Sequence, residues 1–142
     1  MGCMYCEENK DLQDIMDFIT KLQYSKVYLF KDQYYYGRCV VAYCGTHYDE
    51  IFEIPEKERL GFMKEVSDVA QVLKSVTKAD KMNYAIYGDL VSHVHVHLVP
   101  KYRNGSEWGR AFSMDFRGRF IKEEEKKILK DKIAMLLQKE EG

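Results

Sequence analysis

The stretch His93-Val94-His95-Val96-His97-Leu98-Val99 holds three of the four histidines of this 142-residue chain within five positions. Its β-branched and apolar residues favour a strand over a helix. Alternate side chains of a strand share one face, so the histidines are predicted to form a row with neighbours about 6.6 Å apart. The valines then face the core, and this one strand carries both a layer of the fold and the candidate site.

The segments around this stretch predict two hairpins. Residues 82–87 form a strand that joins the histidine strand through a turn around Gly88-Asp89, and Pro100 is expected to end the pairing because it has no N–H to donate. Residues 25–30 and 39–43 are rich in β-branched and aromatic side chains and predict the other hairpin, across a polar, tyrosine-rich connection.

Apolar residues at helical spacing predict three helices. The first covers residues 9–23, the second begins at Pro55 and is long, and the last covers about 121–139. The order helix, hairpin, long helix, hairpin, helix predicts an α+β fold, with an antiparallel sheet of about five strands packed with helices. The whole chain, 1–142, is expected to form a single domain.

Composition narrows the class of protein. The net charge of -1 gives no basic field for nucleic acid or an anionic membrane, and no apolar run approaches the roughly 20 residues of a membrane helix. The N-terminus lacks the pattern of a secretory signal, so a cytoplasmic location with reduced thiols is expected.

The chemistry of the histidine row has three interpretations. The histidines can be a solvated or structural polar face, which three in strict alternation make the weakest interpretation. They can bind zinc together, because three histidines and a water form a catalytic zinc pattern. They can also act as nucleophile and hydrogen-bond donor, because neutral imidazole attacks phosphorus near pH 7.

A pair of cysteines, Cys3-x-x-Cys6, lies at the N-terminus. Metal binding is the favoured interpretation of this spacing. A redox pair is less favoured because the βαβ context of such motifs is absent, and an idle, frayed pair is the third alternative.

The stretch His93–Val99 resembles the signature of the histidine triad (HIT) family, and the resemblance extends from Cys3 to about Trp108. It implies a hydrolase or transferase, usually a homodimer, that acts at the α-phosphate of a purine nucleotide or dinucleotide. It implies that His95 becomes nucleotidylated and that His97 contacts the phosphate or assists the leaving group. Water or another acceptor then takes the nucleotidyl group.

The resemblance to bacterial relatives also implies a structural zinc ion. Its ligands would be Cys3, Cys6, His47 and His93, which leaves His95 and His97 for chemistry. Four protein ligands leave no open position for water, so this zinc would not be catalytic.

The resemblance suggests further nucleotide contacts. Phe30 is expected at the base and Asp32 at the ribose, with Lys31 as the rival for the ribose and a simple turn as the other interpretation of Asp32. Asn83 and Ser92 are expected near the phosphate, and Ser92 alternatively caps a turn. Trp108 is expected on the nucleotide, on a partner subunit or in the core.

One departure from the family concerns the segment before the triad. Tyr87-Gly88-Asp89-Leu90-Val91-Ser92 is short and lacks the Gly-Gln pair of many members, which puts the substrate class in doubt. The short form resembles a branch associated with diadenosine polyphosphates. Two other functions stay open: a zinc hydrolase that uses His93, His95 and His97 as ligands, and a non-catalytic nucleotide-binding module.

Overall fold

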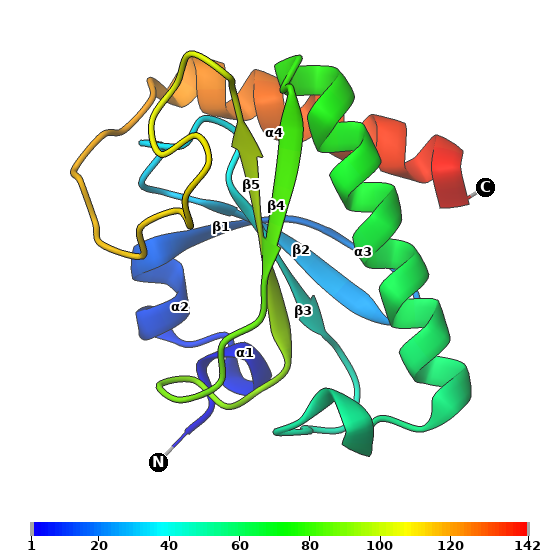
Figure 1. The fold of residues 1–142 in the computed structure, drawn as a ribbon. Coiled ribbons are helices and arrows are strands. Elements are labelled where there is room, and N and C mark those ends of the chain that lie inside the picture. The colour runs from blue at the N-terminus through cyan, green and yellow to red at the C-terminus, as the bar shows by residue number, and fades with distance from the viewer. Residues whose placement is uncertain (1, 142) are drawn as a thin grey trace.

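A computed structural model describes residues 2–141 (Figure 1). Helices alternate with strands in the order that the sequence predicts, except near the N-terminus. The elements are α1 (Met4–Glu7), α2 (Lys10–Ile15), β1 (Met16–Lys21), β2 (Ser25–Phe30), β3 (Cys39–Tyr43), the 3-10 turn η1 (Ile51–Glu53), α3 (Glu56–Thr77), β4 (Lys81–Ala85), β5 (His95–Lys101) and α4 (Glu123–Glu141).

The described residues form one five-stranded sheet in the order β1-β2-β3-β5-β4, and every neighbouring pair is antiparallel. This confirms the predicted α+β fold. The two hairpins, β2–β3 and β4–β5, join along β3 and β5, where Val41 pairs with Val96. The strand with the histidines is therefore held by a partner on each side.

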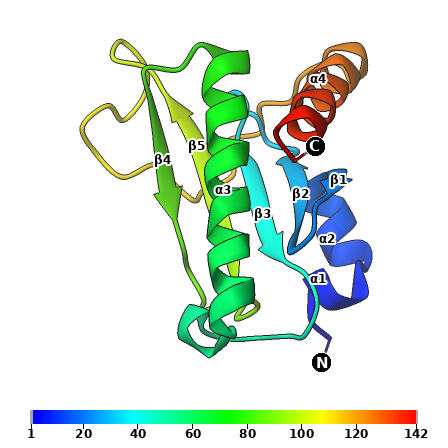
Figure 2. The same ribbon diagram turned by 90° about the vertical axis from the view of Figure 1, so that its right-hand side faces the viewer.

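The two faces of the sheet have different covers. Alternate residues such as Val27, Val41 and Val96 pack with α3 and α4 in one core, and the intervening residues Tyr28 and Ala42 pack with α1 and α2 in a second cluster. Figure 2 shows β2 and β3 between α3 and the pair α1 and α2. Because side chains alternate along β5, His95 and His97 point to the side of α1 and α2.

The two long helices follow the sequence prediction. Pro55 precedes the first residue of α3, and Glu56 and Glu58 lie in its first turn, where negative charge stabilises a helix. Its buried face includes Phe62 and Leu73, which are fully buried, and each such side chain contributes about 1.5–3 kcal/mol to folding. The predicted C-terminal helix at about 121–139 is α4.

The helix predicted over 9–23 is wrong in its second half. The helix α2 ends at Ile15, and residues 16–21 form the edge strand β1 instead. Met16 packs in the cluster under α2, while Ile19 packs on the opposite face of the sheet. Ile19 is also the extra residue at a bulge between Phe18 and Thr20. A strand that is apolar on both faces and bulged imitates helical spacing.

The bounds of β4 and β5 also differ from the prediction. β4 ends at Ala85, and β5 begins only at His95, so His93 precedes the strand and the predicted row of three histidines is broken. Pro100 does not end the strand, because β5 pairs with β4 as far as Lys101. Pairing with β3 stops at Leu98, so Pro100 lies where β5 has a single neighbour.

The described residues include no helix that is both long and apolar enough to cross a bilayer.

Candidate active site and metal cluster

His95 and His97 lie side by side on β5 and are almost completely buried, with exposed fractions of 5% and 3%. Their rings are 5.1 Å apart between centroids. On the neighbouring strand, Ala42 pairs with His95 and Val40 with His97. These short side chains leave room for two imidazoles on this face of the sheet.

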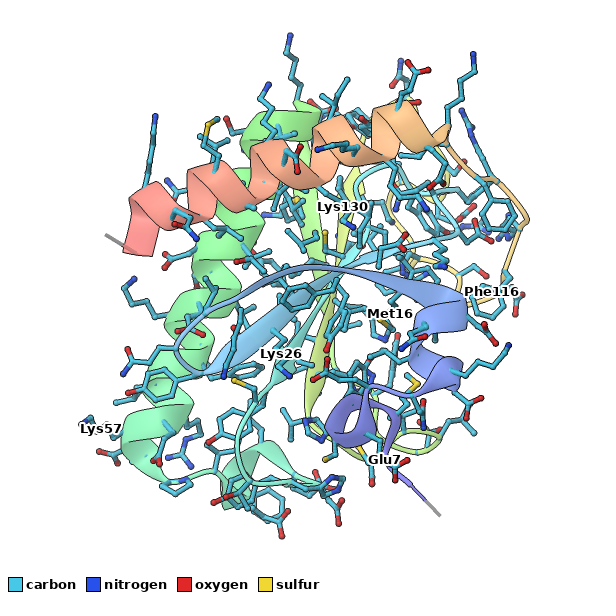
Figure 3. All side chains as sticks on the ribbon, turned by 180° about the vertical axis from the view of Figure 1, so that it is seen from behind. Glu7, Met16, Lys26, Lys57, Phe116 and Lys130 are labelled. Atoms are coloured by element: carbon cyan, nitrogen blue, oxygen red, sulfur yellow. The ribbon has the colours of Figure 1, made fainter. Side chains whose placement is uncertain are left out.

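Both histidines line a pocket of about 550 Å³, a size typical of small-ligand sites. One wall comes from α1 and α2, and another from the segment after β5 that carries Phe116. Figure 3 shows Met16 and Phe116 on the same side of the molecule. The lining is mostly apolar: Met4, Tyr5, Ile15, Met16, Phe30, Tyr87, Asp89, Leu90, Val91, His95, His97, Met114, Asp115 and Phe116.

The ring of His95 is held by its own backbone. Its Nδ1 lies 2.6 Å from the carbonyl oxygen of His93. A carbonyl only accepts, so Nδ1 carries the proton and donates it. Burial lowers the pKa of His95 below its ordinary value, although this hydrogen bond opposes the shift. A neutral His95 then has its lone pair on Nε2.

His97 contacts a buried arginine instead of a carbonyl. Nη2 of Arg38 lies 3.2 Å from Nδ1 of His97. Burial, assisted by the charge of Arg38 and by His95, lowers the pKa of His97 to about 3. Burial also lowers the pKa of Arg38 to about 10, so Arg38 is charged and His97 neutral at pH 7.

A second cluster lies beside the pocket and joins Cys3, Cys6, His47 and His93. One ligand atom from each lies within 4.8 Å of the others. Nδ1 of His93 is 3.4 Å from each sulfur and 3.2 Å from Nδ1 of His47. Tetrahedral zinc separates two nitrogen ligands by about 3.3 Å, and nitrogen from sulfur by about 3.6 Å. The donor set and its spacing therefore fit a metal ion.

Outer hydrogen bonds orient both histidines of this cluster. Nε2 of His93 donates to the carbonyl oxygen of Tyr43 at 2.6 Å, and Nε2 of His47 lies 2.8 Å from a carboxylate oxygen of Asp49. Each bond places the proton on Nε2 and leaves the lone pair of Nδ1 toward the cysteines. Metal-binding histidines are commonly oriented in this way.

Tyr5 connects the cluster with the pocket. It lies between Cys3 and Cys6 in the chain, and its ring is 5.0 Å from that of His95 and 5.5 Å from that of His93. Its side chain is 4% exposed. Tyr5, flanked by the two cysteines, therefore packs directly on His95.

The structure separates the two predicted contacts after β2. Phe30 lines the pocket and stacks on Phe116 at 5.7 Å between ring centroids. The carboxylate of Asp32 accepts instead from the backbone N–H groups of Tyr34, Arg117 and Gly118. Asp32 thus fastens the segment that carries Phe116 to the sheet.

Replacement of Asp32 by alanine is expected to lower the free energy of unfolding by about 1–3 kcal/mol, because three backbone N–H groups lose the carboxylate that accepts from them. Burial alone would raise the pKa of Asp32, but the N–H groups of Gly118, Tyr34, Arg117 and Arg119 outweigh it and lower the pKa. The stabilisation by the charge is therefore full above the unfolded pKa and is lost as pH falls through the lower folded pKa.

Urea unfolding of the wild type and of Asp32→Asn tests the charge. The difference in unfolding free energy should be constant near neutral pH and shrink below about pH 4, the unfolded pKa. A difference that grows on acidification would contradict this role for Asp32.

The remaining predicted contacts lie outside the pocket with His95 and His97. Asn83 and Trp108 line another pocket, of about 540 Å³, and Arg103 lies over the Trp108 ring. Ser92 donates to Asp49, which also contacts His47. Ser92 therefore helps to orient one histidine of the cluster with Cys3 and Cys6.

Sequence reasoning missed several residues of the site. Arg38 is a charged residue directly before the apolar strand β3, and this position was the available signal. Tyr5 lies between the two cysteines, and their spacing says nothing about the residues between them. Met114 and Phe116 lie in a segment without periodicity, so no pattern pointed to them.

Comparisons with known proteins agree with this architecture. A model of the HIT domain family matches residues 10–104. An uncharacterized HIT-like protein of Methanocaldococcus jannaschii is 32% identical over 65 residues, which cover 43% of this chain and 50% of that protein. The alignment thus spans half the length of this curated relative.

Solved structures share the fold over nearly the whole chain. A histidine triad protein from Bradyrhizobium japonicum has a TM-score of 0.83 and 26% identity, covering 91% of this chain and 96% of its own. A Zn-bound histidine triad family protein from Mycobacterium smegmatis has a TM-score of 0.66 and 20% identity, covering 98% and 95%. Since the family match covers more than half of the chain, this protein belongs to the HIT family.

Proposed function

We propose that this protein cleaves nucleotide conjugates at the α-phosphate through a covalent intermediate on His95. The observation that carries the proposal is the hydrogen bond from Nδ1 of His95 to the carbonyl oxygen of His93. It leaves the lone pair on Nε2 of a histidine that lines the pocket.

The reaction has two displacements at phosphorus. Nε2 of His95 attacks the α-phosphorus, an N–P bond forms, and the bond to the leaving group breaks with its electron pair on the leaving atom. Water, or another acceptor, then forms a new bond to phosphorus and returns the electron pair to Nε2. With water, the second step gives a nucleoside monophosphate and releases a proton, and the leaving group has already departed in the first step. From a phosphoramidate, the departing nitrogen takes up a proton and leaves as an amine. His97 lies beside the reacting phosphate and contacts its oxygens or the leaving group.

Cys3, Cys6, His47 and His93 would hold a zinc ion. With four protein ligands the ion is a structural cross-link and supplies no open position for water. This assignment is favoured over a zinc site of His93, His95 and His97. Nδ1 of His93 lies among the cysteines, while Nδ1 of His95 is bonded to a carbonyl.

The substrate is proposed to be a dinucleoside polyphosphate or a nucleoside phosphoramidate, with a purine base in the apolar part of the pocket. A turnover screen of diadenosine polyphosphates, adenosine phosphoramidate and nucleotide sugars tests this proposal. Release of AMP from none of them, at nucleotide concentrations that bind, would favour the non-catalytic module instead. The protein is also proposed to work as a homodimer, which sedimentation equilibrium would test.

Phe116 is proposed to stack on the base. It lies at the pocket wall, parallel to Phe30 within 18°, with 62% of its surface exposed. Phe116→Ala is expected to raise KM by about 5- to 150-fold, as stacking on an aromatic ring contributes about 1–3 kcal/mol per base. The expected kcat stays near that of the wild type.

The matched control is Phe120→Ala, because Phe120 is similarly exposed and does not line the pocket. Steady-state kinetics of both variants decide the matter. Equal KM values for the two variants would place the base elsewhere.

A further inference from the structure

Arg38 is a buried cation next to the proposed reacting groups. It is 3% exposed, and it is not among the residues that line the pocket with His95 and His97, called the catalytic pocket below. Its guanidinium carbon lies 3.9 Å from the centre of the Phe30 ring and 5.2 Å from that of Phe112. Its Nε has no hydrogen-bond partner among the described residues. The aromatic faces therefore hold the guanidinium, and any effect on the substrate passes through a neighbour.

That neighbour is His97. Nη2 of Arg38 contacts two side-chain atoms, Nδ1 of His97 at 3.2 Å and the sulfur of Met114 at 3.3 Å. A guanidinium has only donors, so Nδ1 of His97 must be the acceptor and carries no proton. A second proton on Nδ1 would set two N–H groups of like charge against each other.

We propose that Arg38 is a positioning residue that keeps His97 neutral with its only proton on Nε2. The two catalytic-pocket histidines then have opposite tautomers: His95 has its lone pair on Nε2 and His97 has its proton there. The backbone carbonyl of His93 sets the first tautomer, and Arg38 sets the second. The effect on substrate preference rests on the proposed function, whereas the tautomer of His97 does not.

A neutral His97 donates a hydrogen bond but is a poor proton donor, because loss of its only N–H proton would leave an imidazolate. It can stabilise negative charge on a phosphoryl oxygen during attack by His95. It cannot readily protonate a departing amine. The structure thereby favours leaving groups that depart as stable anions, which are the nucleoside polyphosphates released from phosphoric anhydrides. Phosphoramidates, whose nitrogen needs a proton to leave, are expected to be poor substrates.

The tautomers can be read directly by NMR of the intact protein with ¹⁵N-labelled histidine. Long-range ¹H–¹⁵N spectra at neutral pH, assigned with a His97→Gln variant, show which ring nitrogen is protonated. The expected wild-type result is a protonated Nε2 on His97 and a protonated Nδ1 on His95. Arg38→Met should abolish the single tautomer of His97 and leave that of His95 unchanged, because its partner is a backbone carbonyl.

Two results overturn the proposal. One is a wild-type His97 with its proton on Nδ1 or on both nitrogens. This measurement is made on the wild-type protein, so it does not depend on whether a variant folds. The other is an unchanged His97 pattern in folded Arg38→Met. Neither depends on turnover, so a failure of the proposed reaction would be seen separately, as no AMP release and no labelled His95.

Kinetics test the consequence for substrates. Wild-type kcat/KM is expected to be at least about 10²-fold higher for diadenosine tetraphosphate than for adenosine phosphoramidate, the lower end of what a missing proton donor costs. Arg38→Met should lower kcat for diadenosine tetraphosphate by about 10²-fold, as when one oxyanion donor is lost, with KM changed much less. A preference for the phosphoramidate, or a change confined to KM, would contradict the role assigned to His97.

Discussion

Replacement of His95 by alanine is expected to reduce turnover by about 10⁴-fold or more, because the atom that attacks phosphorus is removed. The variant should still fold. His95 lies at the wall of a pocket, and its neighbours Val96 and Ala42 keep their packing. Turnover of diadenosine tetraphosphate and thermal unfolding, measured on the same preparation, separate the chemical loss from a structural one.

Two further measurements make the role of His95 specific. Substrate labelled at the α-phosphate should leave label on the wild-type protein after an acid-free quench, and none on His95→Ala. Added imidazole, which fits the space that the variant opens, should restore part of the activity. A fully active His95→Ala, or label that persists on it, would refute the proposed mechanism.

Loss of the proposed zinc site at Cys3, Cys6, His47 and His93 is expected to have the largest effect on stability. An ion at a concentration of about 1,000 times its Kd contributes about 4 kcal/mol to the folded state. For a chain of this size, that corresponds to a fall in Tm of roughly 10 °C or more. The double variant Cys3→Ser, Cys6→Ser should show this fall and should purify without stoichiometric zinc.

The matched control is Cys44→Ser, since Cys44 is a free cysteine outside the cluster. It should retain zinc and unfold near the wild-type temperature. Activity should also fall in the double variant, because Met4 and Tyr5 lose their anchor and both line the pocket. Unchanged zinc content and Tm in the double variant would show that Cys3 and Cys6 do not bind zinc.

The fold was predictable wherever helical spacing or a run of β-branched and aromatic residues marks an element. The helix α3 carries its own periodicity, and the structure confirms it. The strands β2 and β3 are buried on both faces and show no such alternation, but their β-branched and aromatic residues predicted them. The strand β1 was not predictable in this way. It buries Met16 on one face and Ile19 on the other, and its bulge adds a residue, so the apolar spacing matches a helical turn.

The site shows the same contrast between local and long-range information. The short spacing of His95 and His97 predicted their shared face, because a strand sets it. Asp32 and Arg38 have partners far along the chain: Asp32 binds the N–H of Arg117, and Arg38 contacts His97. The neighbouring sequence does not name these partners, so it leaves a ribose contact and a turn equally acceptable for Asp32. For Arg38 it shows only a charged residue directly before an apolar strand.

The cluster of Cys3, Cys6, His47 and His93, which we propose holds a zinc ion, also constrains the order in which the molecule can assemble. Cys3 and His93 are separated by 90 positions, yet their ligand atoms lie 3.4 Å apart. During synthesis, the cysteines emerge long before the histidine that completes their site. Closing so long a loop is entropically costly and tends to come late in folding. We therefore expect a nascent chain to form β2 and β3 first. It should bind the proposed metal ion tightly only after β5 has joined the sheet.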